Sequence, residues 1–170
     1  ARSVLTLYSY DPDPETMTLE NELRLAMSLI ARTPIIVAHG YAAKRCYIDG
    51  GSLYLHRAMP HKGTAENFLA ASRDDRKYSD EEAKLLDLCL VLHAEHGGGN
   101  NSTFSTRVIS SSYTDIFSAI AAGVGALKGP RHGGANIRCK EMVDVVAENT
   151  KDWNDDDEIR SVLVRILNKE

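Results

Sequence analysis

Two histidines stand beside glycine runs in this 170-residue chain, and they are its most informative feature. His96 is followed by three glycines at residues 97–99, and His132 lies within residues 129–136, which read GPRHGGAN. Glycine lets the backbone approach a bound ligand closely, because no Cβ intervenes and positive φ is accessible. An imidazole beside such a run can contact a substrate oxygen and exchange a proton near neutral pH. Two such corners in one chain predict an active site.

His132 stands where a turn is expected to become a helix. The positive end of a helix dipole favours a neutral imidazole. A neutral imidazole can donate a hydrogen bond to a carbonyl oxygen that becomes enolate-like. A histidine that only caps its own helix is the commoner case near a helix start. The glycines on both sides of His132 favour the catalytic interpretation.

A metal site is the alternative interpretation of the histidines. His93 and His96 form an H-x-x-H pair with Glu95 between them. A metal-dependent hydrolase would use this pair, with Glu95 or His132 as the third ligand. An H-x-x-H pair is common by chance, and the chain lacks the HExxH pattern. We therefore expect no metal ion and interpret His93 as a packed core histidine.

Short polar residues follow the glycine run. Asn100, Asn101, Ser102 and Thr103 can begin the next helix, and Ser102 or Thr103 is expected to be its N-cap. The same groups can orient a nearby histidine through hydrogen bonds, and both roles are compatible.

Apolar periodicity predicts an all-α fold. Helices are expected at residues 18–33, 35–45, 64–71, 80–92, 102–110, 115–127, 133–149 and 157–168. Pro34 is expected to separate the first two, because the residue before a proline avoids the α region. Ser79 and Glu82 form a capping box at the start of the fourth. No element is assigned to residues 3–10, and residues 47–56 are expected to be an irregular excursion.

Two of these helices have compositions that need close neighbours. Residues 85–92 are apolar nearly all round, which predicts deep burial or a subunit interface. Residues 118–127 are rich in alanine and glycine, including Ala119 and Gly123. Because these side chains are small, we expect the backbone of another helix to pack closely against this one.

Composition places the chain among ordinary globular proteins. Hydrophobic residues make up 43% and charged residues 26%, and the net charge of −4 argues against a nucleic-acid partner. The three cysteines, Cys46, Cys89 and Cys139, form no CxxC motif and predict reduced thiols in a cytoplasmic protein. No continuous apolar run has the length of a membrane span, so no membrane partner is expected. Both chain ends are compatible with a piece of a longer protein.

The residues 92–103, LHAEHGGGNNST, and 129–136, GPRHGGAN, resemble citrate synthases. Residues 28–45, 64–69, 77–99 and 118–136 resemble the central region of the same family, so the resemblance covers nearly the whole chain. It implies a citrate synthase-like multihelical fold. Residues 1–131 would belong to the large helical domain and residues 132–170 would start the small domain. The N- and C-terminal parts of the family's chain would be absent.

The resemblance also implies an activity. Citrate synthases are acyltransferases of the tricarboxylic acid cycle that condense acetyl-CoA with oxaloacetate and water. The reaction passes through an enol or enolate and citryl-CoA and gives citrate and CoA. The family needs no metal or redox cofactor. It is homodimeric, and residues 85–92 and 118–127 correspond to helices at its twofold interface.

The resemblance implies roles only for those residues that match the family's histidine motifs. His132 resembles the catalytic histidine that hydrogen-bonds the thioester carbonyl of acetyl-CoA and stabilises its enol. His96 resembles the histidine that holds oxaloacetate. Asn100 and Ser102 resemble residues that position the catalytic imidazole through hydrogen bonds, and Gly133 lies against the reacting centre. The resemblance places these three residues, with His96, among the substrate-binding residues.

One part of the family's machinery is not found in these residues. The family's second catalytic histidine, in a GYGH- or GFGH-like stretch, its downstream aspartate base and its substrate-binding arginines have no counterpart here. Nothing in the sequence places Asp13, Asp144 or Asp152 near the histidines as a substitute base. These 170 residues alone are therefore expected to be inactive. A 2-methylcitrate synthase and a non-catalytic helical dimerisation or regulatory scaffold are the alternatives.

Overall fold

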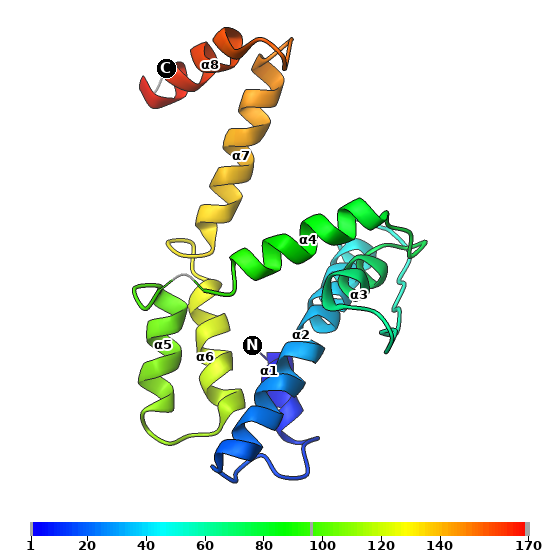
Figure 1. Cartoon of the computed structure of the whole chain (residues 1–170), viewed down its shortest axis with the longest axis vertical. Coiled ribbons are helices and arrows are strands. Elements are labelled where there is room, and N and C mark those ends of the chain that lie inside the picture. Colours follow the sequence, from blue (N-terminus) through cyan, green and yellow to red (C-terminus); the bar gives the residue numbers. More distant parts are fainter. Residues whose placement is uncertain (1, 96, 169–170) are drawn as a thin grey trace. The chain divides into compact units, whose positions relative to one another are not determined.

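The computed structural model describes residues 2–95 and 97–168, and this part of the chain contains helices and no strand (Figure 1). The helices are α1 (Arg2–Tyr8), α2 (Leu19–Tyr47), α3 (Thr64–Ser72), α4 (Asp80–Leu92), α5 (Asn101–Ser110), α6 (Ile116–Leu127), α7 (Gly134–Asn149) and α8 (Asp156–Asn168). The all-α prediction is confirmed.

The chain divides into two compact units, Ala1–Val124 and Gly125–Glu170. The first contains α1–α5 and most of α6, and the second contains the end of α6 with α7 and α8. The boundary expected between residues 131 and 132 concerns the large and small domains of the family, and it stays a prediction.

The core of the first unit joins helices that are far apart in sequence. Val4 of α1, Leu25 and Leu29 of α2, and Phe117 and Ala121 of α6 form one buried cluster. The ring of Tyr8 meets that of Phe117 edge to face, with centroids 6.2 Å apart. The sequence did not predict α1, because its apolar residues show no clear period. A helix of seven residues is marginal by itself and depends on this packing.

The prediction that Pro34 separates two helices is wrong. A single helix, α2, runs through it from Leu19 to Tyr47 (Figure 1). Proline in a helix interior costs about 3 kcal/mol. Burial of Leu25 and Leu29 before the proline and of Ala38 and Ala42 after it offsets that cost, because both halves pack only if the helix continues. The Thr33 hydroxyl also donates to the Leu29 carbonyl at 2.6 Å, beside the missing bond.

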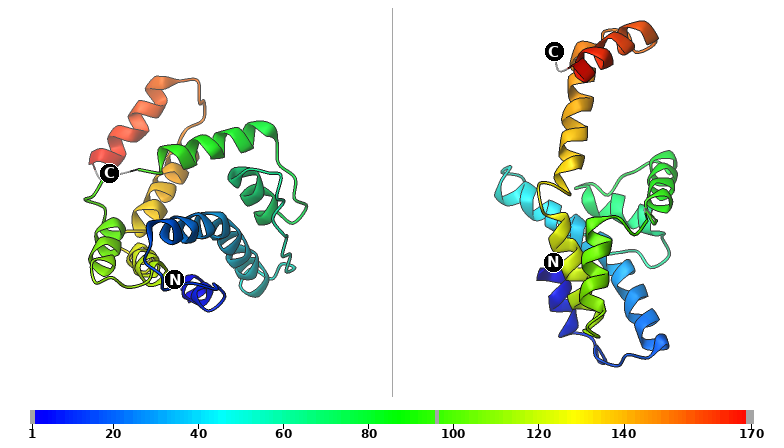
Figure 2. Two further views of the ribbon diagram at one scale, coloured as in Figure 1. Left: turned by 60° about the horizontal axis from the view of Figure 1, so that its bottom comes forward. Right: turned by 90° about the vertical axis from the view of Figure 1, so that its left-hand side faces the viewer.

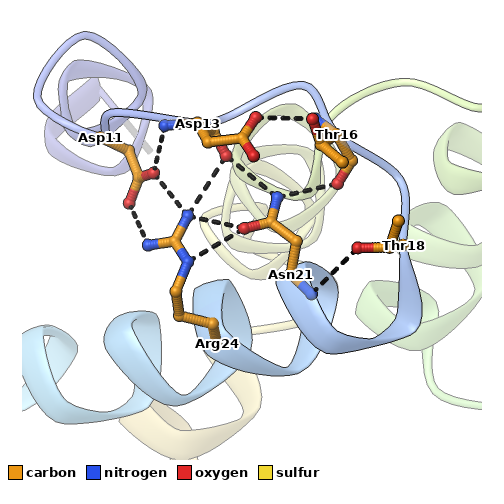
Figure 3. Close-up of polar contacts among 6 residues, drawn as sticks. All are labelled: Asp11, Asp13, Thr16, Thr18, Asn21 and Arg24. Atoms are coloured by element: carbon orange, nitrogen blue, oxygen red, sulfur yellow. Dashed lines mark hydrogen bonds and ion pairs between the residues drawn. The ribbon is translucent and has the colours of Figure 1, made fainter.

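A polar network holds the segment before α2 against the first turns of that helix (Figure 3). Arg24 donates to both carboxylate oxygens of Asp11, at 2.7 and 3.0 Å, and these bonds hold the pKa of Asp11 below its ordinary value. The buried Asn21 amide donates to the carbonyls of Asp13 and Thr16, at 3.0 and 2.8 Å. The Thr18 hydroxyl caps the helix. The network thus sets the path of the chain between α1 and α2.

Among the described residues, α2 is the helix long and apolar enough to cross a membrane by length and composition. The expectation that no membrane partner exists stays a prediction, because this test uses helix length and composition alone. Leu25, Leu29, Ala38 and Ala42 of this helix are nevertheless buried in the first unit, and α2 packs against α1 and α3. Within the described part of the chain, 22% of the apolar window of α2 is buried.

The remaining helix boundaries agree with the sequence within one or two residues. The segment between α2 and α3 is irregular, as expected. It is tied to α2 by a 2.9 Å hydrogen bond between the His39 ring and the His56 carbonyl. Ser79 and Glu82 form the predicted capping box at α4, where the Glu82 carboxylate accepts from the Ser79 N–H at 2.8 Å.

Glu82 is expected to make stability depend on acid pH. Hydrogen bonds from Arg73, and then from the Ser79 backbone, lower the pKa of Glu82 from 4.5 to about 2. Between these values the unfolded chain binds more protons, so the contribution of Glu82 is complete above 4.5 and is lost as the pH falls towards about 2. The difference in melting temperature between the parent and Glu82→Gln should therefore shrink across this window, as followed by circular dichroism.

Glu81→Gln is the matched control, because Glu81 stands in the same first turn but outside the capping box. A Glu82→Gln difference that stays constant as the solution is acidified would contradict the assignment.

Candidate functional site

The first histidine corner begins where α4 ends. His93 is the C-cap of α4, and its Nδ1 donates to the Cys89 carbonyl at 2.7 Å. Its side chain is exposed. The interpretation of His93 as a packed core histidine is therefore wrong, because it ends a helix whose last turns are themselves exposed.

The glycine run follows directly. His96 lies outside the described residues, so its predicted contact with substrate stays a prediction. Gly97 has φ +77°, a conformation that favours glycine. The Gly97 N–H donates to the Glu95 carboxylate across this tight corner. The expectation that the run supplies positive φ is confirmed at Gly97.

Asn100 starts the helix that carries the polar residues of this corner. Its Oδ1 accepts from the N–H groups of Ser102 and Thr103, at 2.8 and 3.2 Å, and makes Asn100 the N-cap of α5. The prediction that Ser102 or Thr103 is the cap is wrong, because α5 begins earlier, at Asn101. Since the cap uses the side-chain oxygen, any hydrogen bond from Asn100 to an imidazole must come from its NH₂ group.

Helix α5 lies against α6, and the two run side by side in both views of Figure 2. An ideal Cβ at Gly123 would stand 2.4 Å from the Thr106 hydroxyl and 3.3 Å from the Ser102 carbonyl. The close approach expected of the small-residue helix is thus confirmed. The sequence did not show that α5 is the neighbour or that Thr106 faces Gly123, since nothing in the spacing pairs the two helices.

The second histidine corner lies in the Gly125–Glu170 unit. The His132 N–H donates to the Gly129 carbonyl at 3.0 Å, and the His132 carbonyl accepts from the Ala135 N–H at 3.2 Å. Gly133 is the N-cap of α7. His132 therefore stands in a turn that leads into a helix, as the sequence predicts. His132 is half-buried.

Gly133 fits its place only because it lacks a side chain. An ideal Cβ there would stand 2.0 Å from the Leu127 carbonyl oxygen and 3.2 Å from its carbon. Both are main-chain atoms, which cannot swing away as a flexible side chain would. The sequence signals this position only as one glycine among several, because the contact with Leu127 is made by the turn.

The three carboxylates considered as bases have local partners. Asp13 accepts from the Thr16 N–H at 3.2 Å, Asp144 from Lys140 at 2.5 Å, and Asp152 from the Asn154 N–H at 2.9 Å. Within residues 2–95 and 97–168, no three metal-binding side chains gather. Because His96 falls outside that part, the metal interpretation of His93 and His96 is untested by this observation.

Several known proteins similar to this chain are citrate synthases or 2-methylcitrate synthases. The chain is 38% identical over 152 residues to 2-methylcitrate synthase 1 of Corynebacterium glutamicum. The aligned region covers 85% of this chain and 38% of that protein. It is 37% identical over 137 residues to citrate synthase of Deinococcus radiodurans, and this aligned region covers 80% of this chain and 34% of that protein. The crystal structure of citrate synthase from Pyrobaculum aerophilum matches with a TM-score of 0.63 at 31% identity, over 88% of this chain and 34% of that chain.

The chain thus spans about a third of the length of these relatives. The family described as citrate synthase, C-terminal domain, matches residues 1–170. Since the match runs over every residue, and relatives and fold agree with it, the chain belongs to the citrate synthase family.

Proposed function

We propose that this chain forms part of a citrate synthase, which condenses acetyl-CoA with oxaloacetate and water to give citrate and CoA. The observation that carries the proposal is the His132 turn. The main chain of His132 makes hydrogen bonds that hold it in a turn leading directly into α7. The imidazole of His132 can donate a hydrogen bond to the thioester carbonyl of acetyl-CoA as negative charge develops on its oxygen.

The chemistry requires three changes at the substrates. A base removes a proton from the acetyl methyl group, and the resulting enol carbon attacks the ketone of oxaloacetate, which forms the new carbon–carbon bond of citryl-CoA. Water then cleaves the thioester and releases CoA. We assign the enol-stabilising hydrogen bond to His132, and contacts with oxaloacetate to His96, Asn100 and Ser102. No step passes electrons to an external acceptor, and a hydrogen-bond donor can stabilise the enol, so we propose that no metal or redox cofactor takes part.

Release of free thiol from acetyl-CoA tests this proposal. The full-length protein that contains these residues should release CoA only when oxaloacetate is present, and EDTA should leave the rate unchanged. The 170 residues alone should release none, because the second histidine and the aspartate base of the family are not among them. No release from the full-length protein would overturn the proposed activity and favour a helical scaffold.

A 2-methylcitrate synthase is the second candidate, favoured by the 38% identity to a protein of that name. This reaction replaces acetyl-CoA by propionyl-CoA. The ratio of kcat/KM for the two thioesters decides between the candidates, and a higher value for propionyl-CoA would replace citrate by 2-methylcitrate as the product.

We also propose that the protein is a cytoplasmic homodimer. Leu85, Leu88 and Leu92 of α4 are 64%, 55% and 67% exposed and recur on one side of the helix. Such a face is stabilised by a second copy of the protein. The three free thiols, Cys46, Cys89 and Cys139, suit a reducing compartment. Sedimentation equilibrium should give twice the chain mass, and Leu88→Arg should shift the protein towards the monomer.

A further inference from the structure

Helices α5 and α6 approach each other closely at Gly123. Gly123 is buried, and the face that it presents meets two residues of α5 that are one turn apart, Ser102 and Thr106. A Cβ closer than 3.0 Å to a neighbour requires that something shift, and the Thr106 hydroxyl would be 2.4 Å away. The hydroxyl is carried by a β-branched side chain, which has two favoured rotamers inside a helix, so relief of the contact requires either a rotamer change or a shift of α5.

The same helix tolerates methyl groups at its other buried positions. Ala119 and Ala121 are 3% and 7% exposed, and their Cβ atoms are accommodated in the packing. The absence of a side chain at Gly123 is therefore a specific feature of the crossing with α5. It leaves room for the Ser102 carbonyl oxygen, from which an added Cβ would stand only 3.3 Å away.

The first turn of α5 carries the polar groups of the first histidine corner. Asn100 caps this turn through the N–H groups of Ser102 and Thr103, and residues 97–99 lead directly into it. A shift of α5 away from α6 would therefore move Asn100 and Ser102 together with the end of the glycine run. Displacements of about 1 Å at a substrate-binding group can lower activity by about 100-fold.

We propose that Gly123 is a positioning residue of the site, which holds the first turn of α5 against α6 and so sets the positions of Asn100 and Ser102 relative to oxaloacetate. This inference rests on the proposed citrate synthase function. Gly123 does not touch substrate. It acts through the distance between α5 and α6, which its missing side chain keeps short.

The experiment compares Gly123→Ala with two further variants, all made in the full-length protein. Thr106→Ala in the Gly123→Ala background removes the hydroxyl that stands 2.4 Å from the new Cβ and leaves the Thr106 Cβ position at 3.8 Å. Gly40→Ala is the control, because Gly40 is also helical and an added Cβ there meets nothing within 4 Å. Each protein is assayed for kcat and for the KM of oxaloacetate.

Gly123→Ala is expected to raise the KM of oxaloacetate by about 10-fold or more, within the range that small displacements produce. The double variant should recover most of the loss, and Gly40→Ala should match the parent. A variant that is only less stable has a smaller active fraction, which lowers the apparent kcat and leaves KM unchanged. An unchanged KM in folded Gly123→Ala would overturn the proposal.

Amide hydrogen exchange separates this inference from the proposed function. If the parent protein forms no citrate, the function fails, and the exchange rates of residues 100–106 then decide about Gly123. Faster exchange there in Gly123→Ala, reversed in the double variant and absent in Gly40→Ala, supports the positioning role. Unchanged exchange in that segment would overturn it.

Discussion

His132→Ala is expected to lower kcat for citrate formation by about 10²–10³-fold, the usual effect of removing one hydrogen-bond donor that stabilises a developing oxyanion. The loss should fall on kcat, because charge develops on the thioester oxygen only as the enol forms. The fold should persist, since the N–H and C=O groups of His132 make the turn with Gly129 and Ala135. Steady-state kinetics and a thermal melt of the full-length variant measure both effects.

His93→Ala is the matched control for this loss. His93 belongs to the other histidine corner, is exposed, and bonds through its ring to the Cys89 carbonyl. Its kcat should stay near that of the parent. Equal losses in the two variants, or an undiminished kcat in His132→Ala, would remove His132 from the catalytic role.

Gly133→Ala is expected to destabilise the protein by about 1–3 kcal/mol, as for other substitutions that overfill a packed site. Its backbone, at φ −67° and ψ −22°, is one that alanine adopts readily, so the cost arises from contact and not from the dihedral angles. The new Cβ would stand 2.0 Å from the Leu127 carbonyl oxygen, and relief requires the turn to move. Because His132 is the adjacent residue, kcat should fall as well.

Gly134→Ala provides the comparison one residue further on. An added Cβ at Gly134 meets only the Pro130 side chain, at 3.8 Å, which is ordinary contact. Alanine at this first position of α7 should be neutral or stabilising by up to about 1 kcal/mol. Urea unfolding of both variants tests the contrast. If Gly133→Ala unfolds at the same urea concentration as Gly134→Ala, the close approach to Leu127 does not constrain the turn.

Local signals in the sequence predicted much of the fold. The capping box of Ser79 and Glu82 located the start of α4, and apolar periodicity located α3 and α6–α8 within one or two residues. The turn that carries His132 was predicted from its glycines and confirmed. These features depend on residues within about one helical turn of one another, so their physical causes are visible in the sequence.

The sequence by itself therefore determined the helical class, most helix boundaries, the two glycine-rich corners and, through their motifs, the family. Tertiary structure decided the rest. It carried α2 through Pro34, made a helix of residues 2–8, and chose α5 as the neighbour of Gly123. Each of these outcomes depends on packing between segments far apart in the chain. The free energy gained by that burial outweighs the local conformational preferences that the sequence indicates.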